Sequence, residues 1–110
     1  MTEITQESIM AAVATGKPHT VVLLKRGPNY ESTGHLQIEH LKHIFAMRAA
    51  GQQVITLPIT EPGELAGISV FVTADKGEAA ALAAADPGVK AGRFTFEVLS
   101  CMALPGDAIP

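Results

Sequence analysis

The chain has 110 residues, of which 47% are apolar and 17% are charged, a balance that suits one folded domain and excludes intrinsic disorder. Its net charge of −3 argues against a nucleic-acid partner, which would need a basic face. No apolar run approaches the roughly 18 residues of a membrane span, and the acidic, polar start (MTEITQESIM) does not resemble a secretory signal. The single Cys101 excludes an internal disulfide and a cysteine-based zinc site, so we expect a cytoplasmic domain without a membrane partner.

The first half of the chain predicts two helices and two strands. Apolar residues fall on one helical face over residues 4–15, and a Gly-x-Pro sequence ends this helix. Residues 20–24 (TVVLL) are β-branched and apolar, which predicts a strand, and a Gly-Pro turn follows them. Helical periodicity then runs over residues 34–50. Residues 54–59 (VITLPI) predict a second strand, with Pro58 at its end or on a sheet edge.

The second half predicts one more helix between two strands. Asp75 and Glu78 have the spacing of a capping box, which marks the start of the helix, and an Asp-Pro-Gly sequence ends it. The predicted loop, strand, helix and strand cover residues 60–67, 68–72, 76–85 and 94–99. The whole chain divides into an N-terminal helical extension, one folded domain and a C-terminal tail, at residues 1–19, 20–104 and 105–110.

The order of elements after the extension is βαββαβ, which predicts an α+β fold of the ferredoxin-like type with an antiparallel four-stranded sheet. The strands are apolar on both faces, but two crossover helices cover only one face of such a sheet. Either the N-terminal extension or a second copy of the chain must therefore cover the other face. We favour a homodimer through the open sheet face, because two-fold symmetry buries matching surfaces without additional sequence.

Three segments of the chain resemble the YciI-like (YCII-related) family. The most specific is residues 84–94 (AADPGVKAGRF), and the others are a His40-Leu41 pair with Gly51 eleven residues later and the strand over residues 68–74 that leads into an alanine-rich helix. The resemblance spans residues 20–102 and departs from the family pattern at Gly88, where the family usually has an aromatic residue, and at Leu57-Pro58, where it tends to have Gly-Pro.

This resemblance implies a dimeric α+β barrel and a small-molecule ligand without a bound cofactor. Family members carry a His–Asp pair suspected of acid/base chemistry, which falls here on His40 and Asp86. Gly88 would remove one wall of a ligand pocket. The same small barrel hosts isomerases, lyases, monooxygenases and members without known activity, so the fold does not settle the function.

His40 is the strongest candidate for chemistry. The predicted helix places it at the margin of an apolar stripe, where an imidazole can face a crevice between helix and sheet. A carboxylate from Asp86 would fix the tautomer of the imidazole and make it a competent acid or base near neutral pH. The alternative is that the pair only ties the helix to the Asp-Pro turn. The stripe consists of Leu41, Ile44, Phe45 and Arg48.

Other polar residues have structural explanations that we prefer. His35, His40 and His43 form an H-x4-H-x2-H cluster, but no third anchor completes a metal site, and His43 is expected to be solvated or bonded to Glu39. The remaining side chains are expected to pack or to be solvated, although Tyr30 could reach a ligand and Lys25 and Arg26 could attract an anion. These side chains are Tyr30, Lys25, Arg26, Arg48 and a buried Cys101.

Two functions therefore stay open. In the first, the protein is a cofactor-independent isomerase or lyase in which His40, oriented by Asp86, moves a proton on a compact cyclic or carbonyl-containing substrate. In the second, the protein is a non-catalytic dimeric domain that binds a metabolite or another protein, and the His–Asp pair is a buried structural clip.

Overall fold

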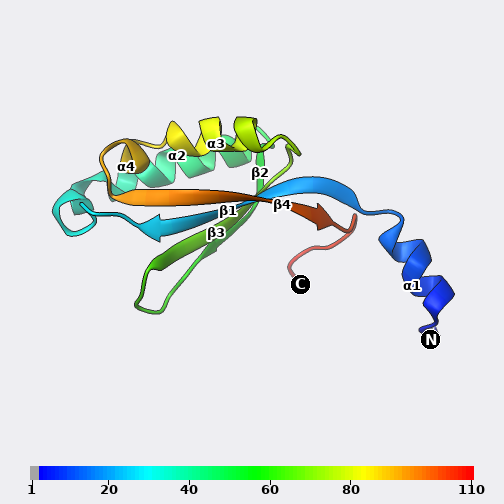
Figure 1. Cartoon of the computed structure of the whole chain (residues 1–110). Helices are drawn as coiled ribbons and strands as arrows, with labels where there is room; N and C mark the ends of the chain where they lie inside the picture. Colours follow the sequence, from blue (N-terminus) through cyan, green and yellow to red (C-terminus); the bar gives the residue numbers. More distant parts are fainter. Residues whose placement is uncertain (1–2) are drawn as a thin grey trace.

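The computed structural model describes residues 3–110 and shows a sheet with helices on one side (Figure 1). The elements agree in type and order with the sequence prediction, and two short helical segments are additional. In chain order they are α1 (Gln6–Val13), β1 (Lys17–Arg26), the 3-10 helix η1 (Glu31–Leu36), α2 (Gln37–Ala49), β2 (Gln53–Pro58), β3 (Leu65–Phe71), α3 (Lys76–Ala84), α4 (Pro87–Lys90) and β4 (Phe94–Ala103).

The four strands form one antiparallel sheet in the order β2-β3-β1-β4. This order is compatible with a ferredoxin-like fold, and it confirms the predicted α+β class and four-stranded antiparallel sheet. β1 lies in the centre, where it pairs with β3 on one side and with β4 along its whole length on the other. The two outer strands of the sheet are β2 and β4.

β1 and β4 are longer than predicted. β1 begins at Lys17, inside the segment assigned to the N-terminal extension, and β4 continues to Ala103, which pairs with Lys17. The added ends, residues 17–19 (KPH) and 100–103 (SCMA), show no regular alternation of apolar and polar residues, so hydrophobic alternation gave no signal for them. Backbone hydrogen bonds between the two strands hold them in the ladder regardless of side-chain type.

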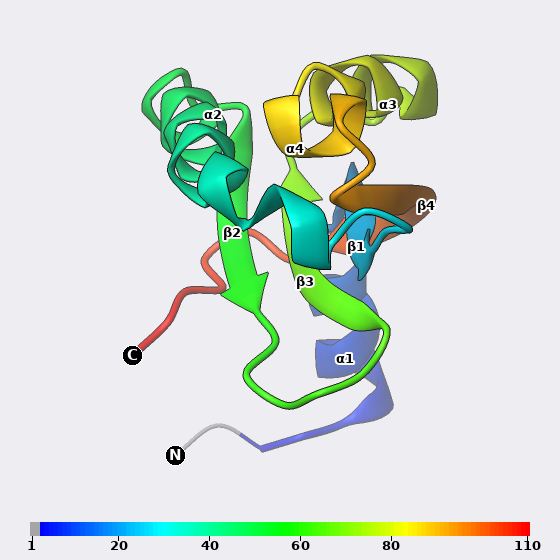
Figure 2. The same ribbon diagram turned by 90° about the vertical axis from the view of Figure 1, so that its left-hand side faces the viewer.

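Helices α2, α3 and α4 lie together over one face of the sheet, and the other face is not covered by any helix (Figures 1 and 2). The strand register places a group of apolar residues on this open face: Val21, Leu23, Ile55, Leu57, Ile68, Val70 and Leu99. The C-terminal tail approaches only one part of the face, where Leu104 and Pro105 line a hollow with Ile55 and Val70.

The N-terminal helix α1 leads away from the end of the sheet (Figure 1). Thr5 and Ser8 form a reciprocal capping box at its start, and no residue of the helix is buried. The extension therefore leaves the open face of the sheet uncovered. No helix within residues 3–110 has the length and apolarity that a bilayer crossing requires.

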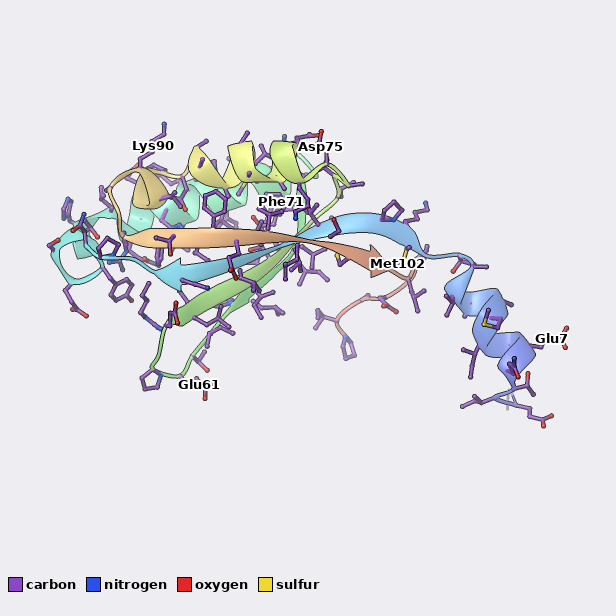
Figure 3. All side chains as sticks on the ribbon, in the orientation of Figure 1. Glu7, Glu61, Phe71, Asp75, Lys90 and Met102 are labelled. Atoms are coloured by element: carbon purple, nitrogen blue, oxygen red, sulfur yellow. The ribbon has the colours of Figure 1, made fainter. Side chains whose placement is uncertain are left out.

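The core lies between the sheet and the helices and is small. Phe71 points from β3 toward the helices (Figure 3) and is almost fully buried. Ala79 and Ala83 let α3 approach the sheet closely. The buried cluster consists of Val22, Met47, Phe71, Ala79 and Ala83, with Ile44, Leu82, Phe96 and Val98 packed against it.

The predicted apolar stripe of α2 is correct at Ile44 and wrong in its direction on the helix. Phe45 is 63% exposed, and the buried positions are His40 and Met47 instead. The helix is rotated so that His40, Ile44 and Met47 face inward, at i, i+4 and i+7. A histidine occupies the apolar face because it meets a buried hydrogen-bond partner there.

The start of α3 also differs in detail from the prediction. Asp75 caps the helix and accepts hydrogen bonds from the backbone N–H groups of Gly77 and Glu78, as expected. The Glu78 carboxylate does not return to Asp75, however, and accepts a hydrogen bond from the Thr73 hydroxyl instead. Thr73 in turn accepts from the Asp75 N–H, so the capping box is closed through a third residue.

Candidate functional site

The structure brings the two predicted site residues together. His40, in the first turn of α2, and Asp86, between α3 and α4, lie 2.5 Å apart from imidazole Nδ1 to carboxylate Oδ2. Their side chains are only 6% and 5% exposed. A hydrogen bond to an ionised group at this distance and burial is of the strong, charge-assisted kind.

Asp86 is held in place by the helix that follows it. It is the N-cap of α4, with Pro87 at the first helical position, and its Oδ1 accepts a hydrogen bond of 2.8 Å from the Gly88 N–H. The Asp-Pro-Gly sequence ends α3 as predicted, but it also begins α4, which the sequence did not predict. The cap occupies one carboxylate oxygen and leaves Oδ2 for His40.

The contact with Asp86 fixes the chemistry of the imidazole. Because a carboxylate accepts, Nδ1 of His40 carries the proton, and in the neutral ring Nε2 then has the free lone pair. Nε2 of His40 has no hydrogen-bond partner in residues 3–110. Within the same residues, every side-chain nitrogen or oxygen that is fully buried does have a partner, so Nε2 is not fully buried. Nε2 therefore keeps some contact with solvent although the residue as a whole is buried.

A cleft of about 220 Å³ lies beside His40. Helix α2 forms one wall, and the ends of β1, β2 and β3 form the other. The lining is mostly apolar and includes six polar side chains: Arg26, Tyr30, Gln37, His40, Thr56 and Ser69. This combination of an apolar cleft with a few convergent polar groups is typical of small-molecule sites.

Gly88 does not leave the cleft without an aromatic wall. The Phe94 ring lies 4.5 Å from the His40 ring, centre to centre, and lines the cleft. A Cβ atom added at Gly88 would meet the Phe94 ring at 3.0 Å. The first residue of β4 therefore fills the space that was expected to be empty, and glycine at position 88 permits it.

We expect Gly88→Ala to lower the free energy of unfolding by about 1–3 kcal/mol, because overpacking moves the Phe94 ring and the backbone around it. Urea denaturation measures this difference. Gly34→Ala is the matched control, since a Cβ at Gly34 meets no atom within 4 Å. Equal midpoints for the two variants would show that Phe94 adjusts freely and that the close packing has no energetic role.

The other two histidines of the cluster are not near a metal site. His43 donates a hydrogen bond from Nε2 to the Leu82 carbonyl at 2.8 Å, which ties α2 to α3. The expectation of a solvated His43 or a bond to Glu39 is therefore wrong, and Glu39 pairs with Lys42. His35 lies exposed in η1, and residues 3–110 contain no group of three or more side chains placed to bind a metal ion.

Arg93 is the site residue that sequence reasoning missed. Its guanidinium donates from Nε and Nη2 to the Gln37 side-chain oxygen and from Nη1 to the Tyr30 carbonyl. It also lies 4.3 Å from the centre of the Tyr30 ring. Arg93 thereby positions two residues that line the cleft. An arginine before a strand has no distinctive spacing, so only the fold reveals this role.

The remaining candidates make structural contacts, and one of them, Tyr30, also lines the cleft. Tyr30 packs against Phe94 and Arg93 and also lines the cleft. Lys25 pairs with Glu97 at 3.3 Å, and Arg48 binds the Thr56 hydroxyl and lies over the Phe45 ring. Cys101 is only partly buried, not fully as expected.

No protein-family model and no curated protein matches this chain. The assignment to the YciI-like family therefore stays a prediction from the three segments that suggested it. Because one fold of this kind serves many functions, the chemistry has to be inferred from the site itself.

Proposed function

We propose that the protein is a cofactor-independent isomerase or lyase of the YciI-like family that moves a proton on a compact cyclic or carbonyl-containing substrate. His40 exchanges the proton through Nε2. Asp86 holds the ring by Nδ1 and stabilises the imidazolium that forms when Nε2 takes up a proton. The observation that carries the proposal is that the two ring nitrogens of His40 have different surroundings. Nδ1 is bound to a buried carboxylate, whereas Nε2 has no partner in the described part of the chain.

Deuterium exchange tests this proposal with compounds that need not be the natural substrate. A base that removes a carbon-bound proton returns a deuteron in D2O, so the protein should catalyse loss of α-proton signals in a panel of small ketones and lactones, measured by 1H NMR. His43→Gln is the control, because His43 is bonded to the Leu82 carbonyl and should leave the rate unchanged. Exchange at the buffer rate across the panel would contradict the proposal.

A second function is favoured by a separate observation. Asp86 also caps α4, and the His40 ring packs on Phe94, so the pair connects three elements of the structure. A purely structural clip in a metabolite- or protein-binding domain would have the same contacts. The two functions differ in whether Nε2 of His40 exchanges a proton, and a variant that removes Nε2 but keeps the bond to Asp86 separates them.

We further propose that the protein is a cytoplasmic homodimer, and that two sheets face each other in a barrel. The apolar side chains of the open face support this, since α1 does not cover them and the C-terminal tail approaches only the part around Ile55 and Val70. Exposed apolar patches of this kind mark interaction surfaces. Two-fold symmetry is the simplest arrangement that buries such a face against itself.

We expect light scattering to give twice the chain mass for the natural sequence and the chain mass for Val70→Lys, because a lysine in the middle of the open face would be buried in the dimer without a partner. Ile38→Lys is the control. Ile38 is an exposed isoleucine of α2 in the helical layer, and its replacement should leave the dimer intact. A dimeric Val70→Lys, or a monomeric natural protein, would contradict this proposal.

A further inference from the structure

We infer that the cleft beside His40 binds a compact organic carboxylate, whose charged end meets Arg26. This inference rests on the site of the proposed function and names the class of its ligand. It comes from the charges and the unused hydrogen-bond donors around the cleft. Neither the family resemblance nor the His–Asp pair contributes to it.

The surroundings of the cleft have an excess of positive charge although the chain as a whole carries −3, since two guanidinium groups, Arg26 and Arg93, outnumber the Asp86 carboxylate behind His40. Arg26 lines the cleft, and Arg93 lies behind it against the same Tyr30 ring. No carboxylate within residues 3–110 comes within salt-bridge distance of either guanidinium. Glu64, which follows the Gly63 carbonyl that Arg26 binds, is directed toward Lys25 instead.

Arg26 presents the part of its guanidinium that recognises carboxylates. Its hydrogen bonds to the carbonyls of Gly63 and Leu65 both come from Nη1. Nε and Nη2 have no partner in the described part of the chain and are open to solvent, since no buried side-chain nitrogen there lacks a partner. Two N–H groups pointing the same way form the fork that binds a carboxylate through both oxygens. The carbonyls therefore hold the side chain and leave its binding edge free.

Arg93 orients a second donor. Because the guanidinium of Arg93 can only donate, the side-chain oxygen of Gln37 faces it, and the amide nitrogen of Gln37 points away. The hydrogen bonds of Gln37 and Tyr30 within residues 3–110 involve neither that amide nitrogen nor the Tyr30 hydroxyl. Three groups that line one cleft thus offer unused donors: Arg26, Gln37 and Tyr30. Such an excess of donors over acceptors favours an anionic oxygen ligand.

The remaining walls select the rest of the ligand. Most of the lining is aliphatic or aromatic, including Leu41, Ile44 and Phe94, which suits a hydrocarbon body rather than an inorganic ion. The volume of about 220 Å³ lies below the roughly 300–1,000 Å³ that drug-sized ligands occupy. A carboxylate with a small cyclic or branched body fits both properties, and its body would lie beside His40.

Benzoate is a suitable probe, and benzamide is its uncharged counterpart of nearly equal shape. We expect benzoate to shift the 1H–15N NMR signals of the Gln37 side chain and of residues around Arg26, with saturation. Benzamide should bind at least tenfold more weakly. Arg26→Gln should weaken benzoate binding at least tenfold, and Arg26→Lys should recover part of it. Lys76→Gln removes one positive charge from the exposed start of α3, outside the cleft, and should change nothing.

Three outcomes would overturn the inference. They are equal binding of benzoate and benzamide, equal losses in Arg26→Gln and Lys76→Gln, and inorganic phosphate binding to the same residues as tightly as benzoate. Preserved dispersion of the NMR signals in Arg26→Gln would show that this variant is folded. If it is not folded, benzoate titration of Arg26→Lys tests the same contact. Benzoate binding without any deuterium exchange would refute the proposed function alone, whereas exchange with indifferent benzoate and benzamide binding would refute this inference alone.

Discussion

Replacing Asp86 with alanine is expected to lower the free energy of unfolding by about 2–5 kcal/mol, because two hydrogen bonds of different kinds are lost together. One is the buried, charge-assisted bond to His40, whose Nδ1–H would be left without an acceptor. The other is the N-cap of α4, which satisfies the Gly88 N–H. For a domain with so small a buried core, a loss of this size is a large part of the total stability.

Comparison with Asp75→Ala shows how much of the lost unfolding free energy belongs to the His–Asp pair and how much to the helix cap. Asp75 caps α3 in the same way that Asp86 caps α4, but it contacts no histidine and is exposed. Its replacement should therefore cost only the cap, about 0.5–2 kcal/mol. Urea or guanidinium unfolding of the three proteins measures both differences. If Asp86→Ala and Asp75→Ala lose the same amount, the buried pair adds nothing to stability and the structural clip is refuted.

Replacing His40 with asparagine should reduce catalysed proton exchange at least 100-fold while leaving the free energy of unfolding within about 1 kcal/mol of the natural protein. The asparagine amide nitrogen can occupy the position of the imidazole Nδ1 and donate to Asp86. It has no atom at the position of Nε2. The variant therefore keeps the clip and removes the proposed base, which is the distinction between the two candidate functions.

His40→Gln is the complementary variant, because its longer side chain carries the amide nitrogen to the position of Nε2 and gives up the contact with Asp86. It should lose both stability and exchange. Deuterium exchange by 1H NMR and urea unfolding give the two readouts for each variant. Full exchange activity in His40→Asn would place the base elsewhere and would refute the role proposed for Nε2.

The order and type of the elements could be predicted from the sequence because they depend on strong local signals. Runs of β-branched residues and the Gly and Pro stops located every strand of the sheet and the α2 and α3 helices. The inward face of α2 was mispredicted because hydrophobicity favours Phe45 over His40. A histidine becomes a core residue only when a distant carboxylate meets it, and no local pattern contains that information.

The candidate site was predictable only in part. His40 and Asp86 were predicted through a resemblance to a family and lie in contact in the structure. The unused donors of Arg26 and Gln37 could not be foreseen, since they depend on what the rest of each side chain meets: backbone carbonyls for Arg26 and the Arg93 guanidinium for Gln37. The sequence predicted an empty space at Gly88, because glycine has no side chain to form a wall. In the structure the Phe94 ring occupies this space, and Phe94 belongs to a different element of the chain.

The central position of β1 has a consequence for how the chain acquires its structure during synthesis. β1 is the first strand to be made, yet β4, its partner along the whole length, is the last. Until β4 emerges from the ribosome, one edge of β1 and the nascent core between sheet and helices stay open to other chains. Closing the sheet therefore requires contacts between distant parts of the chain, and the entropy lost in closing so long a loop slows folding.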